Sequence, residues 1–294
     1  MRRSFLQLHI AILLAGFTGV LGRLITLNEG LLVWYRMFFS LLGLLALGWL
    51  RGGLPRASSP ASARRLLGTG ALVALHWVTF YGSIKYANVS VGLVCFSSVC
   101  FFTAVLEPLL QRRPPVTVEL LLGVLVMVGI ALIFRFDATY RTGILLGVAS
   151  SLLAALFTVL NKRWLARESP ETVNVYEMAG GWLSLTLLLP FYAAVFPPDH
   201  WLPTFSDFVW LLFLSLLCTV LAIRLSLMAL REVSPFTVNL SYNLEPLYGI
   251  LLAFLIYRED RQLGPGFYAG MSIIVLSVLL QTARVWIGRP SSRT

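Results

Sequence analysis

Residues 239–255 read NLSYNLEPLYGILLAFL and place a carboxylic acid, Glu245, beside Pro246 within a run of Leu, Ile, Phe and Tyr. A proline inside a helix removes one backbone hydrogen bond and leaves a carbonyl without its helical partner. In the hydrocarbon of a membrane, such a carbonyl or a carboxylate is tolerated only where it faces protein or a water-filled cavity. The stretch therefore predicts a membrane-spanning helix that lines an internal cavity.

The composition of the whole chain also indicates a membrane protein. Of the 294 residues, 58% are hydrophobic and 12% are charged, and the mean hydropathy is +0.82. An ordinary soluble domain carries roughly a quarter charged residues, and a spanning helix needs about 20 mostly apolar residues. We expect an all-α integral membrane protein with ten transmembrane helices, near residues 6–26, 30–50, 66–86, 90–110, 117–135, 142–162, 174–196, 207–230, 235–257 and 266–286.

The net charge is +10, and the distribution of the basic residues along the chain agrees with the expected topology. If the N-terminus is cytoplasmic, most of the Lys and Arg residues fall in cytoplasmic connections, and this positive-inside bias places both termini in the cytoplasm. The basic excess then indicates contact with anionic lipid and argues against nucleic acid as a partner. We expect a monomer in a bacterial inner membrane, with a small molecule as its substrate.

The motifs of several function classes are missing from the sequence. It contains no Walker A sequence, no HExxH, no paired aspartate motif and no serine-centred elbow. Its three cysteines lie in apolar segments without the spacing of a metal site. We expect no cofactor, no metal site and no enzymatic activity.

Weak internal similarity divides the chain into two halves, residues 1–137 and 138–294. Val89-Ser90 corresponds to Val233-Ser234, and WYRM at 34–37 corresponds to VYEM at 175–178. Because each half has an odd number of expected helices, the second half enters the membrane from the opposite face. Such inverted repeats place the substrate site of a transporter between them, near the middle of the membrane. A second Leu-Glu-Pro at 106–108 does not fit this correspondence, and we interpret it as a coincidence.

The 5+5 arrangement resembles the drug/metabolite transporter superfamily, specifically its ten-helix EamA type. The resemblance rests on WYRMFFSLLGLLAL (34–47), on YANVSVGLVCFSSVCFFTAVLEPLL (86–110) and on LREVSPFTVNLSYNLEPLYGILLAFLIYRED (230–260). The last looks like the family's closing pattern, with Glu259 as its acid. The first half departs from the pattern, with Cys100 in place of a proline and Arg113 in place of that acid.

The aromatic segment ALHWVTFYGSIKYA (74–87) is most similar to the YddG-type amino-acid exporters. The resemblance implies export of amino acids or related metabolites by alternating access. It also implies a central cavity enclosed by the first, third, fourth, sixth, eighth and ninth helices. The lightly charged aromatic lining favours neutral or hydrophobic amino acids with broad specificity. The alternatives are other metabolites or drugs, such as nucleotide precursors, sugars and cationic compounds, and then a lipid enzyme or a channel.

Glu245 is the first candidate for the binding site. It can meet a substrate amine or carry a proton, or it can be a structural acid that is hydrogen-bonded to a tyrosine or to Arg224.

Asn239 and Asn243 share a helical face with Pro246 at i, i+4 and i+7 spacing, and Tyr242 borders that face. These side chains either bind the amino and carboxyl groups of a substrate or join helices by hydrogen bonds.

The expected helix at 66–86 carries His76, Trp77, Phe80 and Tyr81 near its middle, and Trp182 also lies in mid-span. Aromatic side chains far from the interface form either a cavity wall, which attracts an ammonium group by cation–π interaction, or ordinary packing between helices. His76 can in addition carry a proton. Coupling by His76 or Glu245 and uniport both remain open at this point.

Two charged residues occupy equivalent positions in the two halves, Arg36 and Glu177. A salt bridge between them would form a gate, and the alternative is local pairing of each near a membrane interface.

Milder polar candidates, which are more often packing positions, are Ser97, Ser98, Ser150, Ser151 and Thr158. We include Ser97 among the substrate-binding candidates.

Overall fold

The computed structural model describes residues 2–133, 140–258 and 265–287. The first half contains α1 (Arg2–Leu24), α2 (Glu29–Leu50), α3 (Pro60–Tyr86), α4 (Val89–Phe96), α5 (Val99–Gln111) and α6 (Thr117–Ile133). The second half contains α7 (Arg141–Trp164), α8 (Pro170–Val195), α9 (Phe205–Ser215), α10 (Ala222–Glu232), α11 (Pro235–Ser241), α12 (Glu245–Tyr257) and α13 (Pro265–Ile287). The described residues form no β-strand, so the expected all-α class is confirmed.

Eight helical segments are long and apolar enough to cross a membrane, and α6 and α13 are shorter apolar helices. The expected segments coincide with helices of the structure within a few residues at most ends, although α3 begins six residues earlier. The number of ten spans and the cytoplasmic position of the termini stay predictions.

Most of these helices begin where the sequence supplies a cap. Ser59, Ser169 and Ser234 each accept a hydrogen bond from a backbone N–H of the first turn and are followed by a proline. Proline fits the first helical position because the N–H it lacks has no partner there. Asn28 and Asn88 cap α2 and α4 in the same way.

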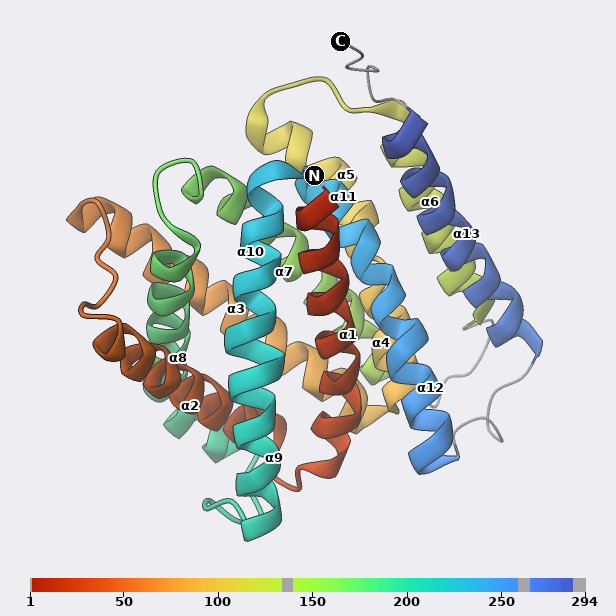
Figure 1. Ribbon diagram of the computed structural model, residues 1–294. Coiled ribbons are helices and arrows are strands. Elements are labelled where there is room, and N and C mark those ends of the chain that lie inside the picture. The colour runs from red at the N-terminus through yellow and green to blue at the C-terminus, as the bar shows by residue number, and fades with distance from the viewer. Residues whose placement is uncertain (1, 134–139, 259–264, 288–294) are drawn as a thin grey trace.

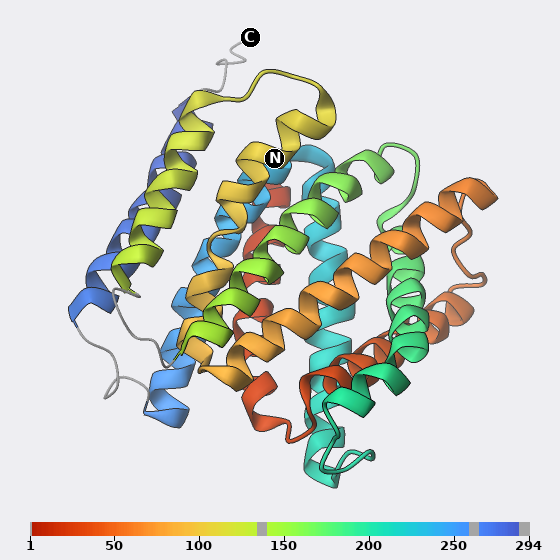
Figure 2. The same ribbon diagram turned by 180° about the vertical axis from the view of Figure 1, so that it is seen from behind.

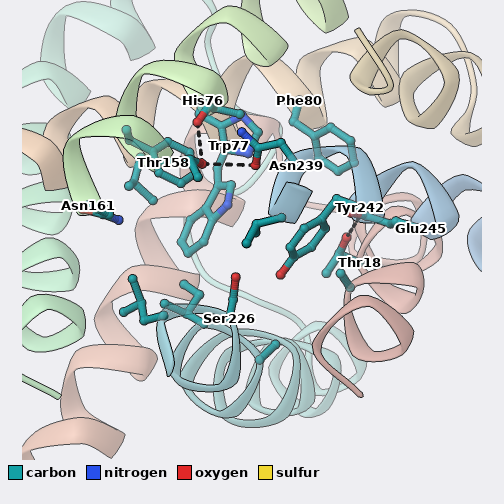
Figure 3. Close-up of a pocket in the computed structure, with 18 of the residues that line it drawn as sticks. Thr18, His76, Trp77, Phe80, Thr158, Asn161, Ser226, Asn239, Tyr242 and Glu245 are labelled. Atoms are coloured by element: carbon teal, nitrogen blue, oxygen red, sulfur yellow. Dashed lines mark hydrogen bonds between the residues drawn. The ribbon is translucent and has the colours of Figure 1, made fainter. Parts of the chain in front are cut away.

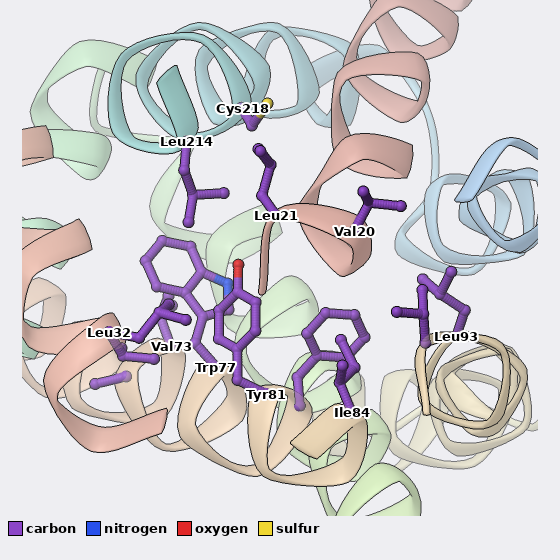
Figure 4. Close-up of a cluster of buried hydrophobic side chains, with 14 of the residues drawn as sticks. Val20, Leu21, Leu32, Val73, Trp77, Tyr81, Ile84, Leu93, Leu214 and Cys218 are labelled. Carbon is purple, nitrogen blue, oxygen red and sulfur yellow. The ribbon is translucent and has the colours of Figure 1, made fainter. Parts of the chain in front are cut away.

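The helices pack as a bundle in which α1 runs along α10 and α12, while α3 runs along α7 and crosses α8 (Figures 1 and 2). The pair α6 and α13 lies side by side at one edge. Figure 4 shows the buried core, where Leu21, Leu32, Trp77, Tyr81 and Leu214 meet. Large apolar side chains also cover the outside of the bundle, which suits a lipid-facing surface.

The crossing of α3 and α8 depends on glycines. A Cβ atom added at Gly70 would lie 2.2 Å from the Glu177 carbonyl oxygen, and one at Gly180 would lie 2.1 Å from the Leu67 carbonyl oxygen. Only residues without a side chain permit this approach of two backbones. The crossing fixes the position of Glu177 against α3.

Three of the expected helices are not continuous, which corrects the sequence prediction. Residues 89–111 break at Ser97-Ser98, residues 205–232 contain a π-helical segment at Leu216–Leu221, and residues 235–257 contain a 3₁₀ turn at Tyr242–Leu244. At the last break, Pro246 cannot donate to a preceding carbonyl, and the Glu245 N–H bonds the Tyr242 carbonyl instead. Glu245 therefore lies in the first turn of α12, where a helix favours negative charge.

Candidate functional site

A cavity of about 130 Å³ lies within the bundle (Figure 3). Its lining comes from α1, α2, α3, α4, α7, α8, α10, α11 and α12, from the π-helical segment and from the 3₁₀ turn before α12. Of the predicted site residues, eight line it: Arg36, His76, Trp77, Phe80, Glu177, Asn239, Tyr242 and Glu245. Four others are not among its lining residues: Tyr81, Ser97, Trp182 and Asn243.

Glu245 is 4% exposed, and its Oε1 accepts a hydrogen bond of 3.4 Å from the Thr18 hydroxyl of α1. Thr18 also lines the cavity and is not among the residues predicted from the sequence. The alternative prediction of a hydrogen bond between Glu245 and Arg224 is wrong. Arg224 pairs with Glu171 instead, with 2.9 Å between its Nε and Oε1 of Glu171. Glu245 thus keeps acceptor capacity that faces the cavity.

Arg36 supplies a positive charge to the same cavity and is 3% exposed. Its Nε donates to Thr219 Oγ1 at 2.8 Å, and its Nη1 donates to the Tyr81 hydroxyl oxygen at 2.7 Å. The guanidinium carbon lies 3.6 Å from the centroid of the Trp77 ring. Tyr81, which does not line the cavity, therefore acts by holding Arg36.

The structure shows no ion pair between Arg36 and Glu177, so it gives no support to the hypothesis of a gate formed by these two residues. The structure does not place the two side chains near an interface either, because both are buried and line the cavity. Arg36 and Glu245 line the same cavity. The first half thus contributes a positive charge to the lining and the second half contributes the carboxyl group of Glu245.

Asn239 is held by one neighbour on each side. Its Nδ2 donates to Thr103 Oγ1 at 2.8 Å, and its Oδ1 accepts from the Thr158 hydroxyl at 3.3 Å. Asn243 does not line the cavity, but its Nδ2 lies 3.6 Å from Cys100 Sγ. Cys100 and Thr103 lie one turn apart on α5, so both amides face the same helix, in agreement with their i, i+4 spacing.

The aromatic wall surrounds His76. Its ring centroid lies 5.4 Å from those of Phe96 and Phe157 and 6.2 Å from that of Phe80. Its Nδ1 lies 2.8 Å from Ser150 Oγ and 3.0 Å from the Ser150 carbonyl oxygen. Ser150 was recognised as a polar candidate, but its pairing with His76 was not.

Glu177 and Asn161 form another polar part of the lining. Glu177 is 1% exposed and Asn161 is 3% exposed, and the two side chains are neighbours on the cavity lining. Glu177 Oε1 and Asn161 Oδ1 have no hydrogen-bond partner. Glu177 is among the residues predicted from the sequence, and Asn161 is not, although it lies three residues after Thr158 on the same helical face.

The remaining candidates lie in the packing of the bundle. The Trp182 ring contacts Trp34 and Phe38, with centroid distances of 5.8 and 5.7 Å. Ser97 is fully buried at the break between α4 and α5. The described residues contain no group of His, Cys, Asp and Glu suited to a metal ion, and Glu259 lies outside the described part of the chain.

Comparison with known proteins places this architecture in a family. A family model for the EamA-like transporter family matches the chain twice, at residues 3–135 and 141–283. A solved structure described as "Crystal structure of protein" has a TM-score of 0.70, with 17% identity over 97% of this chain and 99% of the other. At this identity the likeness concerns the fold alone. No curated protein matches the sequence. The chain belongs to the EamA-like transporter family, within the drug/metabolite transporter superfamily of membrane transporters.

Proposed function

We propose that this transporter exports amino acids or related small metabolites across the bacterial inner membrane, with broad specificity for neutral and hydrophobic amino acids. The observation that carries the proposal is the presence of both a guanidinium group and a carboxyl group on the lining of one aromatic cavity. Arg36 comes from α2 and Glu245 from the start of α12. An amino acid presents the complementary pair of charges.

In this proposal the substrate carboxylate binds Arg36. A guanidinium group has five N–H donors, and the structure assigns one from Nε and one from Nη1 to protein partners. The remaining donors can take a carboxylate, for which the planar guanidinium is well suited. The substrate ammonium group binds Glu245, whose carboxyl group has one hydrogen bond of 3.4 Å from Thr18.

The substrate side chain lies against the wall formed by Trp77, Phe80, Phe96 and Phe157. Such a wall discriminates weakly between apolar groups, because one methylene changes binding by only about 1–3 kcal/mol. The breadth of specificity in the proposal follows from this weak discrimination. The likeness of residues 74–87 to YddG-type exporters supports the same substrate class.

Transport would proceed by alternating access, with the repeats 1–137 and 138–294 rocking around the site. Discontinuous helices around a central site are typical of transporters with inverted repeats, and α4–α5 and α11–α12 are both broken. The proposal includes ten spans and cytoplasmic termini. Glu245 or His76 would carry the proton if export is proton-coupled, and a uniporter would need neither.

A second candidate is export of cationic metabolites or drugs. It is favoured by the presence of two carboxyl groups, Glu177 and Glu245, in a cavity that also contains Trp77. Such compounds would need Glu245 but would not need Arg36. Direct binding of a cationic drug and of leucine to Arg36 variants therefore separates the two candidates, because only the binding of the drug should persist.

The proposal is tested by uptake into liposomes that contain the purified protein. Radiolabelled leucine, methionine, phenylalanine, threonine and glutamate are supplied with and without a pH gradient, against empty liposomes. Saturable uptake of the neutral amino acids is expected, and its response to the gradient identifies coupling. Glu245→Gln is expected to abolish this uptake, whereas Glu171→Gln, which changes a partly exposed acid on α8, is the matched control. Absence of uptake for all of them would reject the amino-acid assignment.

A further inference from the structure

The cavity contains a second buried carboxyl group that the proposed amino-acid site does not use. Glu177 lies on α8, is 1% exposed and lines the cavity. Its Oε1 has no hydrogen-bond partner, and no cationic side chain pairs with it in the described part of the chain. Asn161 of α7 lines the cavity beside it and also has an unpartnered oxygen, Oδ1.

This polar pair is separate from Glu245. Figure 3 shows Asn161 and Glu245 on opposite sides of the cavity, with the indole of Trp77 between them in the view. The cation that the cavity already contains does not satisfy the pair, because the Arg36 hydrogen bonds go to Thr219 and Tyr81. The cavity thus has two distinct acidic positions.

The chemistry of the two oxygens defines what they can bind. A carboxylate and an amide oxygen are acceptors only, and a buried acceptor without a donor is destabilising. A buried carboxylate in addition requires a positive partner. A group that carries positive charge, and that donates to oxygen or is coordinated by it, satisfies both conditions at once.

We propose that Glu177 and Asn161 form a second cation-binding subsite of the transport cavity, which receives the side-chain ammonium of a dibasic amino acid or a free monovalent cation. The first occupant rests on the proposed function. Two carboxyl groups and one guanidinium group in one cavity complement the two ammonium groups and one carboxylate of a dibasic amino acid. A third unpartnered oxygen, Asn174 Oδ1, lies one helical turn before Glu177 on α8.

The test measures binding of lysine and norleucine to the purified full-length protein in choline buffer. The two ligands differ only by the ammonium group at the end of the side chain. We expect Glu177→Gln to weaken lysine binding by about tenfold or more, because it removes one partner of a buried charge pair, and to change norleucine binding less than about threefold. Asn161→Ala keeps the carboxyl group and is expected to lower lysine binding to a smaller extent.

The matched control is Glu171→Gln, which makes the same change on the same helix outside the cavity. It is expected to leave both affinities unchanged. A second arm replaces choline with sodium. If the occupant is a free cation, sodium strengthens norleucine binding by wild-type protein and has no effect on Glu177→Gln. The proposal is overturned if the lysine-to-norleucine ratio and the sodium response are the same in wild-type and Glu177→Gln protein.

Failure of the proposed function gives a different result. If wild-type protein binds neither amino acid, the amino-acid assignment is rejected, and the subsite is judged from thermal unfolding in n-butylammonium or sodium against choline at equal ionic strength. A rise in unfolding temperature in wild-type protein that Glu177→Gln and Asn161→Ala both reduce supports the subsite. The absence of any rise in wild-type protein rejects it.

Discussion

The guanidinium group of Arg36 lies over the indole ring of Trp77, with 3.6 Å between the guanidinium carbon and the ring centroid. Arg36 comes from α2 and Trp77 from α3, and both line the cavity. The ring, together with the hydrogen bonds to Thr219 and Tyr81, offsets the cost of burying a positive charge. The cation is therefore fixed in place before a substrate enters.

Loss of the Tyr81 hydroxyl group should weaken substrate binding through Arg36. Tyr81→Phe keeps the buried ring but removes the acceptor of the Nη1 hydrogen bond at 2.7 Å. A hydrogen bond to a charged group is worth about 1.5–3 kcal/mol, so we expect leucine affinity to fall by about tenfold or more. Binding is measured with the purified protein. Tyr86→Phe, on the exposed end of α3, should have no effect, and equal losses in both variants would contradict the prediction.

Removal of the Thr103 hydroxyl group should destabilise the protein through Asn239. Thr103→Val leaves Nδ2 of Asn239 without the acceptor that now lies 2.8 Å away. An unsatisfied buried donor costs about 1–3 kcal/mol, and we expect a lower unfolding temperature in detergent. In the control Thr79→Val, the hydroxyl group that is lost bonds only carbonyls of its own helix. An unchanged unfolding temperature in Thr103→Val would show that Asn239 does not depend on this bond.

The crossing of α3 and α8 should not tolerate a methyl group at Gly70. A Cβ atom there would lie 2.2 Å from a backbone oxygen of Glu177, so the helices must separate. We expect Gly70→Ala to destabilise the protein by at least about 2 kcal/mol, in the range of overpacked cores. Gly68→Ala on the same helix meets nothing within 4 Å and should be neutral or stabilising by up to about 1 kcal/mol. Similar unfolding temperatures for the two variants would contradict the packing described here.

Glu168 in the connection between α7 and α8 should make stability depend on acid pH. Burial raises the pKa of its carboxyl group, but hydrogen bonds from Ser58 and Ser62 outweigh this effect and hold the pKa below its ordinary value. A carboxyl group with a lowered pKa stabilises the fold above its unfolded pKa, about 4.3, and that contribution is lost as the pH falls through the folded value. The difference in unfolding temperature between wild-type and Glu168→Gln protein should therefore be constant from pH 7 to about 5 and shrink as the pH falls below about 4.3.

A second pair of substitutions checks the origin of this dependence. Ser58→Ala combined with Ser62→Ala removes the two hydroxyl donors and keeps the carboxyl group. The double variant should lose most of the effect of Glu168→Gln at pH 7. If Glu168→Gln has the same effect with and without the two serines, these hydrogen bonds do not lower the pKa.

The sequence predicted the helical segments well because long apolar runs and caps such as Ser59-Pro60 and Ser234-Pro235 are local signals. It also predicted that Glu245 and Asn239 line the cavity, because polar groups in apolar runs require an internal environment. It did not predict the 3₁₀ turn before Glu245 or the π-helical segment, in which Thr219 bonds the Leu214 carbonyl and Arg36.

The partners of the site residues were also missed. Thr18, Thr103 and Asn161 are single polar residues in apolar helices, and such residues are common as packing positions. Their role depends on which helix lies opposite, and this is a property of tertiary packing that periodicity along one helix does not contain. For the same reason, the equivalent positions of Arg36 and Glu177 in the two halves did not reveal that Arg36 bonds Thr219 and Tyr81.

The central claim is that Arg36 binds the carboxylate and Glu245 binds the ammonium group of one amino acid. The most direct measurement compares leucine, leucinamide and 4-methylvalerate as ligands of wild-type, Arg36→Gln and Glu245→Gln protein. We expect leucine to bind wild-type protein most tightly, Arg36→Gln to remove the preference for leucine over leucinamide, and Glu245→Gln to remove the preference over 4-methylvalerate. Preferences that persist unchanged in both variants would show that neither residue recognises the charged groups of an amino acid.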